Sequence, residues 1–286
     1  MKTRTVIATL LLLGLALTAA SAEESWLNRP EHKVRFEFST EMGFLSVVYH
    51  TIQFGQSGTE FDYVADGGQD VYFPVRRISA DVSFGPRHKL VLLYQPIDVR
   101  TEVRFFDPVK VYDVTFTPPG TGEGLPMELR YGFDYYRVSY LYDFWKDPRN
   151  ELAAGLSLQM RDAVIVFAQK DGLKIVSNED IGPVPIFKFR WKSYLGPTWW
   201  LGSEIDGFYA SGRFITGSAN DFVGAILDAS LRAGFSPREA LDVFLNVRYL
   251  GGGAVGTAED QAVGGVDGYT RNWLHTVSLS LGVTVR

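Results

Sequence analysis

Two long runs of alternating apolar and polar residues, joined by a tight turn, constrain the fold of this chain more than any other feature. The alternation covers residues 223–234 and resumes in 241–250 after Ser236-Pro237-Arg238. A period of two predicts β-strands, because successive side chains point to opposite faces. One face is apolar throughout, whereas the other carries Asp, Ser, Arg, Asn and Gly. Strands of about ten residues with this pattern are typical of a transmembrane β-barrel, which has lipid outside and polar groups inside.

The start of the chain predicts export. Lys2 and Arg4 precede an apolar stretch at 6–17, and small residues at 20–22 supply a cleavage site. The apolar stretch is shorter than the ~20 residues that a membrane-spanning helix needs. We therefore expect a cleaved signal peptide at 1–22, a periplasmic segment at 23–32 and a barrel domain at 33–286. The chain has no Cys and so no disulfides.

Composition excludes two function classes. The net charge of −5 lacks the basic footprint of a nucleic-acid-binding protein, so no nucleic-acid partner is expected. After the signal, the longest uninterrupted apolar run is residues 163–168, too short for a spanning helix. If the chain crosses a membrane, it must therefore do so as a closed barrel, in which every backbone group is paired. No cofactor is indicated.

The alternating segments predict an all-β, antiparallel, up-and-down transmembrane β-barrel of about ten strands, with eight and twelve as the alternatives. The expected strands lie near residues 33–48, 75–85, 89–100, 130–144, 152–161, 187–192, 199–206, 223–234, 241–250 and 276–285. Pro96 predicts a bulge or break in the third strand, and the alternation in the fourth strand indicates a change of phase near Tyr135 and Tyr136. Links alternate between long and short: short turns lie around Pro86, Pro148, Pro197 and Pro237, and long loops at 49–74, 101–129, 165–184, 211–220 and 251–270.

This pattern resembles bacterial outer-membrane β-barrel proteins as a class, over nearly all of residues 33–285. The class has short periplasmic turns, long extracellular loops and both termini on the periplasmic side. The resemblance implies a monomer in the outer membrane of a Gram-negative-type envelope. Its partners would be outer-membrane lipid and lipopolysaccharide, and the outer-membrane assembly machinery during biogenesis. Members usually end in an aromatic residue, whereas this sequence ends in Arg286.

If the apolar positions face lipid, the charged positions of the same strands face the lumen. Opposite charges on neighbouring strands can pair, and a small barrel has room for little besides its own side chains. We therefore expect a plugged, salt-bridged lumen and a structural or surface-recognition role. A narrow ion or solute channel is one alternative, although a wide porin needs about 16 strands. The expected lumen charges are Arg35, Glu37, Arg77, Asp81, Lys188, Arg190, Lys192, Glu204, Asp206, Asp228, Arg232, Asp242 and Arg248.

A second alternative is an outer-leaflet lipid-modifying hydrolase or a protease near the extracellular rim. His50 and His275 lie near the outer ends of the first and last strands, with Ser46 nearby in sequence. Parity predicts that both histidines face outward unless a bulge intervenes. The sequence has no Gly-x-Ser-x-Gly motif and no metal-spaced histidine pair. It therefore favours a non-enzymatic role, with Ser46, His50 and His275 as the catalytic candidates for the alternative.

The long loops are acidic. Asp62, Asp66 and Asp70 are weak candidates for a divalent-cation site, since carboxylates on loops are ligands that Ca²⁺ and Mg²⁺ prefer. Their spacing matches no EF-hand, so no metal site is predicted. These loops are also candidates for binding an extracellular ligand, because the binding residues of proteins often lie on loops held by a rigid scaffold.

Overall fold

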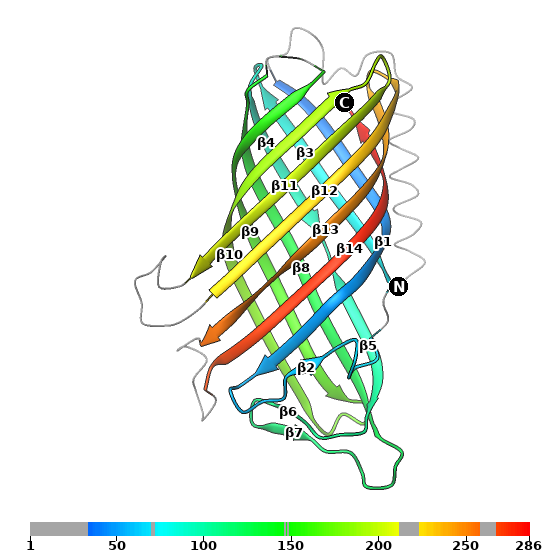
Figure 1. Cartoon of the computed structure of the whole chain (residues 1–286), viewed down its shortest axis with the longest axis vertical. Coiled ribbons are helices and arrows are strands. Elements are labelled where there is room, and N and C mark those ends of the chain that lie inside the picture. Colours follow the sequence, from blue (N-terminus) through cyan, green and yellow to red (C-terminus); the bar gives the residue numbers. More distant parts are fainter. Residues whose placement is uncertain (1–33, 70–71, 146, 148, 212–222, 258–266) are drawn as a thin grey trace.

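The computed structural model is a closed antiparallel β-barrel (Figure 1). It describes residues 34–69, 72–145, 147, 149–211, 223–257 and 267–286, so the expected signal peptide and periplasmic segment lie outside the described residues. The barrel closes where β1 (Val34–Phe54) pairs with β14 (Tyr269–Val285). No helix in the described part of the chain is long and apolar enough to cross a bilayer.

The described wall has ten strands that follow one another in chain order. After β1 come β3 (Tyr72–Phe84), β4 (His88–Gln95) with β5 (Asp98–Phe105), β8 (Leu125–Asp143), β9 (Glu151–Gln169), β10 (Ile175–Tyr194), β11 (Trp199–Ser211), β12 (Val223–Arg238) and β13 (Leu241–Thr257). β4 and β5 pair with successive parts of β8, so they are two halves of one wall strand that is interrupted at Pro96 and Ile97. The predicted fold class, the count of ten and the break at Pro96 are confirmed.

The short turns gather at one end of the barrel, the upper end in Figure 1, which we call the short-turn end. The opposite end, which we call the long-link end, carries the connections from β1 to β3 and from β5 to β8. The predicted long loop at 165–184 is wrong. β9 and β10 pair continuously from Ala168–Ile175 to Glu151–Lys192, and only residues 170–174 connect them. Backbone hydrogen bonding continues these two strands through residues whose side chains no longer alternate between apolar and polar.

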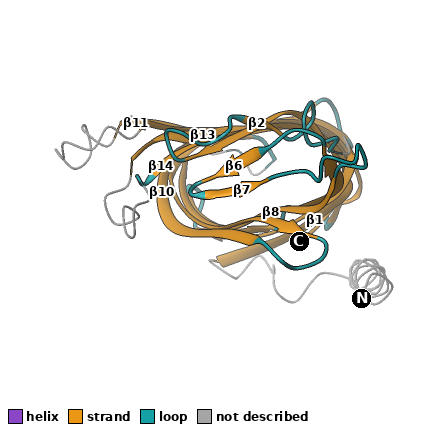
Figure 2. Cartoon of the chain, turned by 90° about the horizontal axis from the view of Figure 1, so that it is seen from below, coloured by secondary structure: helices purple, strands orange, loops and turns teal. Residues whose placement is uncertain are grey.

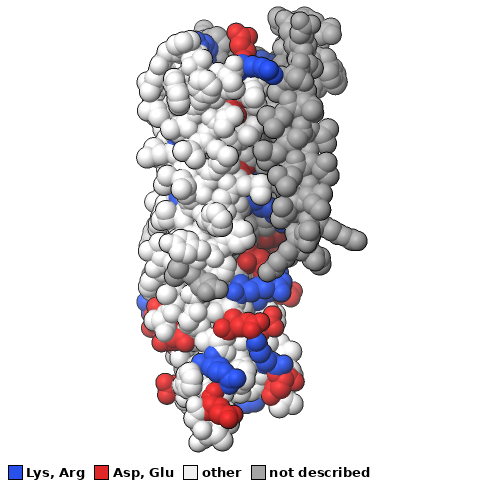
Figure 3. Space-filling model, turned by 90° about the vertical axis from the view of Figure 1, so that its right-hand side faces the viewer, with Lys and Arg blue, Asp and Glu red and all other residues white. Residues whose placement is uncertain are grey.

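The outer face of the barrel is apolar over most of its height. In β14, Val277, Leu279 and Leu281 are exposed, while Ser278 and Ser280 between them are buried against the lumen. Outward-facing charges begin towards the long-link end, at Arg76, Asp98, Asp134 and Asp162 on four neighbouring wall strands. On the face shown in Figure 3, charged side chains crowd the lower part, while the described surface above is largely uncharged. We call the uncharged zone the belt.

An apolar core fills the lumen at the long-link end. Two segments fold across the opening: residues 55–69, which include β2 (Phe61–Asp62), and a hairpin of β6 (Val109–Val111) and β7 (Val114–Phe116). We call these two segments the stopper. Figure 2, seen from this end, shows β6 and β7 lying across the barrel opening. Sequence reasoning treated both segments as extracellular loops and did not foresee that they pack into the lumen.

The stopper explains the apparent change of phase in β8. Odd-numbered residues of β8 are buried from Leu125 to Asp143, apart from the half-buried Phe133, and the pairing with β9 has no register shift. The inward residues are apolar beside the stopper, as at Leu129 and Tyr131, and polar further along, as at Arg137 and Ser139. The predicted phase slip is therefore wrong: the composition of the lumen changes, not the direction of the side chains.

Candidate functional site

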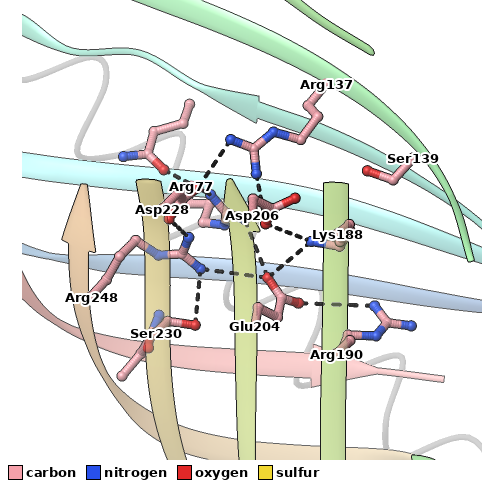
Figure 4. Close-up of polar contacts among 12 residues, drawn as sticks. Arg77, Arg137, Ser139, Lys188, Arg190, Glu204, Asp206, Asp228, Ser230 and Arg248 are labelled. Carbon is pink, nitrogen blue, oxygen red and sulfur yellow. Dashed lines mark hydrogen bonds and ion pairs between the residues drawn. The ribbon is translucent and has the colours of Figure 1, made fainter. Parts of the chain in front are cut away.

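Between the stopper and the short-turn end, the lumen is crossed by ion pairs (Figure 4). Arg137 on β8 reaches Asp206 on β11, with Nη1 2.8 Å from Oδ2, and Asp228 on β12, with Nη2 3.1 Å from Oδ2. All three side chains are fully buried. Gln159 accepts two further hydrogen bonds from Arg137, at 3.0 and 2.7 Å. Because β8 is three strands from β11 and four from β12, these contacts span the lumen and do not merely link neighbours.

A second arginine reaches the same carboxylates from the other side. Arg77 on β3 lies 3.4 Å from Glu204 and 3.7 Å from Asp228. Arg248 on β13 pairs with Asp228 and lies 3.6 Å from Glu204. Asp228 therefore contacts three guanidinium groups from three different strands. We call these residues, together with the pairs of Lys188, Arg232 and Glu41, the ion-pair layer.

A further set of charges lies at the short-turn end. Arg190 pairs with Asp81 and with Glu151, whose other oxygen pairs with Lys89. Arg286 lies 3.3 Å from Glu37 on β1 and also pairs with Asp242 on β13, so it bridges the two strands that flank β14. A small cavity of about 60 Å³ lies among these side chains. A cavity of this size holds no more than a few water molecules.

The two charge sets are nearly neutral together. Nine bases face eight acids: Arg77, Lys89, Arg137, Lys188, Arg190, Lys192, Arg232, Arg248 and Arg286 against Glu37, Glu41, Asp81, Glu151, Glu204, Asp206, Asp228 and Asp242. Selectivity filters built from charged side chains have rings of one sign. The balanced pairing seen here instead suits a lumen that is filled and held together.

The structure brings together twelve of the thirteen charges that were expected in the lumen, each in at least one ion pair. The thirteenth, Arg35, is exposed at the mouth of the barrel. Five members escaped sequence reasoning: Glu41, Lys89, Arg137, Glu151 and Arg286. The parity of Glu41 with Glu37 was a usable signal, whereas Arg137 was hidden by the supposed phase slip in β8.

His50 belongs to the stopper and not to an outer catalytic site. The register of β1 against β14 shifts between Val47 and Tyr49, and this bulge turns His50 inward, so the outward orientation predicted from parity is wrong. The ring stacks on Tyr63, with centroids 3.9 Å apart, and Nδ1 lies 3.1 Å from Oε1 of Gln69. The bulge thus places His50 where it contacts Tyr63 and Gln69 and holds residues 55–69 in the lumen.

The other catalytic candidates do not assemble with His50. His275 lies on the outer face, as its parity predicts, and its Nδ1 is 2.5 Å from the hydroxyl of Tyr249. Ser46 lies before the bulge, on outward parity, and so faces away from His50. A nucleophile and its base need hydrogen-bond contact, and these three side chains make none with one another.

Two of the acidic candidates in the first long link, Asp62 and Asp66, accept hydrogen bonds from backbone N–H groups of the same link. Oδ1 of Asp62 accepts hydrogen bonds from the N–H groups of Val64 and Ala65, and Asp66 accepts one from the N–H of Asp62. Asp70 lies outside the described residues. No group of three or more metal-ligating side chains occurs in the described part of the chain.

Comparison with known proteins finds similarity of fold at low sequence identity. No protein-family model matches the chain, and no curated protein matches it. The outer membrane protease OmpT from Escherichia coli aligns over 92% of this chain and 99% of its own, with 11% identity and a TM-score of 0.46. The transport unit of the autotransporter AIDA-I from Escherichia coli aligns over 96% of both chains, with 9% identity and a TM-score of 0.42. The outer membrane protein OprG from Pseudomonas aeruginosa aligns over 87% of this chain and 96% of its own, with 13% identity and a TM-score of 0.32.

These values assign no activity. The strand pairing itself shows the fold: over the described residues, the chain is a closed, ten-stranded antiparallel barrel.

Proposed function

We propose that the protein is a closed outer-membrane barrel that displays a rigid recognition surface at its long-link end. The observation that carries this proposal is the double closure of the lumen, by the ion-pair layer and by the stopper. A barrel filled in this way has little room to transport a solute, so its exposed outer end is the part left for function. The apolar belt supports the placement in a membrane, because an open apolar surface of this extent is stable only against lipid.

Exposed apolar side chains favour recognition over a purely structural role. At the long-link end, beyond the belt, Leu173 is 80% exposed, Phe106 67% and Ile175 61%. Exposed apolar residues beside a polar rim mark contact surfaces for other molecules. Around them, Lys170 pairs with Glu102, and Lys174 donates to the backbone carbonyl of Thr115. The surface is therefore held in shape before a partner arrives.

Cysteine labelling tests the orientation. Because the chain has no Cys, Leu173→Cys and Asn150→Cys each introduce a single thiol, one in the β9–β10 turn and one in the turn before β9. On intact cells, a membrane-impermeant maleimide is expected to label Leu173→Cys, and to label Asn150→Cys only after the outer membrane is opened. The reverse labelling pattern would show that the long-link end faces the periplasm and would contradict the proposed orientation. If the protein is found in a soluble fraction and both variants are labelled equally, the proposed placement in a membrane is contradicted.

Single-channel recording tests the closure. We expect purified wild-type protein inserted into planar bilayers to show no stepwise conductance, because charged and apolar layers close the lumen in series. Insertion is checked on the same preparation by flotation with vesicles and by heat-modifiable migration in detergent gels. Reproducible conductance steps from folded, inserted protein would contradict the closed barrel and favour the narrow channel.

A further inference from the structure

The outer face of β10 to β14 is hollowed on the side of the belt that is nearer the long-link end. A groove of about 480 Å³ runs over these strands, with walls that are almost entirely apolar. This volume falls within the range of about 300–1,000 Å³ that is usual for sites of small molecules. The groove lies on the outside of the barrel, so the lumen charges and the stopper take no part in it.

Small residues form the floor of the groove and aromatic residues form its rim. Gly207, Ala225 and Gly251 lie on the three neighbouring strands β11, β12 and β13, and their lack of bulk opens the hollow. Phe187, Tyr209 and Trp273 stand around it. From the groove towards the short-turn end, the surface continues into exposed Leu231, Val247 and Val277. The groove is thus an indentation of the lipid-facing belt itself and is open to whatever occupies the lipid phase.

One polar pair interrupts the apolar wall. Tyr249 on β13 and His275 on β14 both face outward, and the phenol hydroxyl is hydrogen-bonded to Nδ1 at 2.5 Å. Gly251 allows this contact: a Cβ there would lie 2.2 Å from the Tyr249 hydroxyl oxygen and 2.8 Å from Nδ1 of His275. Polar side chains at the edge of a hydrocarbon phase are costly unless they meet polar partners. With Nδ1 engaged, Nε2 of His275 is the ring atom that would meet a ligand.

We propose that this groove holds an acyl chain of lipopolysaccharide, with the headgroup of the lipid at the Tyr249–His275 pair. The inference rests on the proposed membrane placement, which puts the groove at the outer-leaflet level. An acyl chain gains no hydrophobic free energy on moving from bulk lipid into the groove, since both surroundings are apolar. Its retention comes from van der Waals contact with the walls and from hydrogen bonding of the headgroup to His275.

Native mass spectrometry with matched variants tests the site. Wild-type protein extracted from lipopolysaccharide-containing outer membrane is expected to retain one lipopolysaccharide molecule. Ala225→Leu fills the floor of the groove and should reduce the retained fraction at least tenfold. Ala233→Leu makes the same change on the same strand and outward face, outside the groove, and should retain lipid like wild type. Retention of phospholipid instead, or equal loss in both variants, would overturn the proposal.

A second variant guards against misfolding. At Gly207 an added Cβ would meet its nearest atoms at 3.7 Å, an ordinary contact, so the wall accepts a side chain here, and Gly207→Leu extends one into the groove. It should lose lipid as Ala225→Leu does while keeping heat-modifiable migration. Photo-crosslinking with a diazirine acyl chain separates the two proposals. Crosslinks spread evenly around the belt would refute the groove alone, whereas no crosslinks anywhere would refute the membrane placement.

Discussion

Replacing Asp228 by asparagine is expected to lower the free energy of unfolding by about 3–5 kcal/mol, the cost of removing one partner from a buried ion pair. Asp228 is fully buried and contacts Arg77, Arg137 and Arg248. The uncharged amide leaves three guanidinium groups close together with one carboxylate fewer, and buried charges without a partner are far more costly than the pair is stabilising. Urea unfolding of protein folded into lipid vesicles, followed by tryptophan fluorescence, measures the difference.

The matched control is Asp98→Asn. Asp98 also pairs with arginines, at 2.8 Å from Arg130 and 3.2 Å from Arg100, but it lies at the outer edge of the belt with its side chain 40% exposed. Partial burial alone would raise the pKa of Asp98, but hydrogen bonds and charge from Arg130 and Arg100 outweigh it and lower the pKa. The carboxylate is therefore ionised, as a control for charge requires. We expect a loss of at most about 1 kcal/mol, as for exposed pairs in general.

The comparison between these two variants decides what the ion-pair layer does. A similar small loss in both would mean that water reaches the layer and screens it, which an open path through the lumen would explain. A large loss in Asp228→Asn alone indicates that the layer is dry and structural. The test therefore bears on function as well as on stability.

The wall of the barrel was predictable from the sequence because the bilayer imposes a simple rule on it. Where one face meets lipid and the other meets water or charge, alternation reveals both the strand and the direction of its side chains. β12, β13 and β14 follow this rule along most of their length, and so do the lumen charges on β12 and β13. Glu151, one of the charges missed on other strands, lies directly after a turn, where a short polar stretch does not distinguish strand from link.

The rule fails where lipid no longer lies outside the wall. Beyond the belt, β9 and β10 continue to pair although their outward residues are mixed, and Pro183 and Asp171-Gly172 resemble loop signals. In the same region the interior is apolar, so inward residues such as Leu129 resemble lipid-facing ones. The sequence did contain a signal for the apolar core at this end. Three aromatic residues in the supposedly solvated loops need a place to be buried: Phe61, Tyr63 and Phe116. Which core they join depends on contacts between segments far apart in sequence.

The stopper is expected to open independently of the wall, and Phe61→Ala provides the test. Phe61 is 2% exposed and packs against Tyr63, Phe105 and Phe167, with ring centroids 5.2 to 5.5 Å apart. Truncating a buried phenylalanine costs about 3–5 kcal/mol. At about 1.4 kcal/mol per tenfold change, the open population should rise roughly 10²- to 10⁴-fold. Chymotrypsin cleavage after Tyr63 in intact vesicles, mapped by mass spectrometry, should accelerate accordingly.

Phe106→Ala is the matched control, because Phe106 is 67% exposed and its removal leaves the core intact. Its cleavage rate after Tyr63 should equal that of wild type, and unchanged cleavage in Phe61→Ala would contradict a separately folded stopper. Single-channel recording of Phe61→Ala then tests whether the ion-pair layer closes the lumen without the stopper. The pairs of Arg137 with Asp206 and Asp228 still cross the lumen when the stopper opens, so the variant should remain silent. Conductance in Phe61→Ala would show instead that the stopper is the sole barrier and that the rest of the lumen conducts.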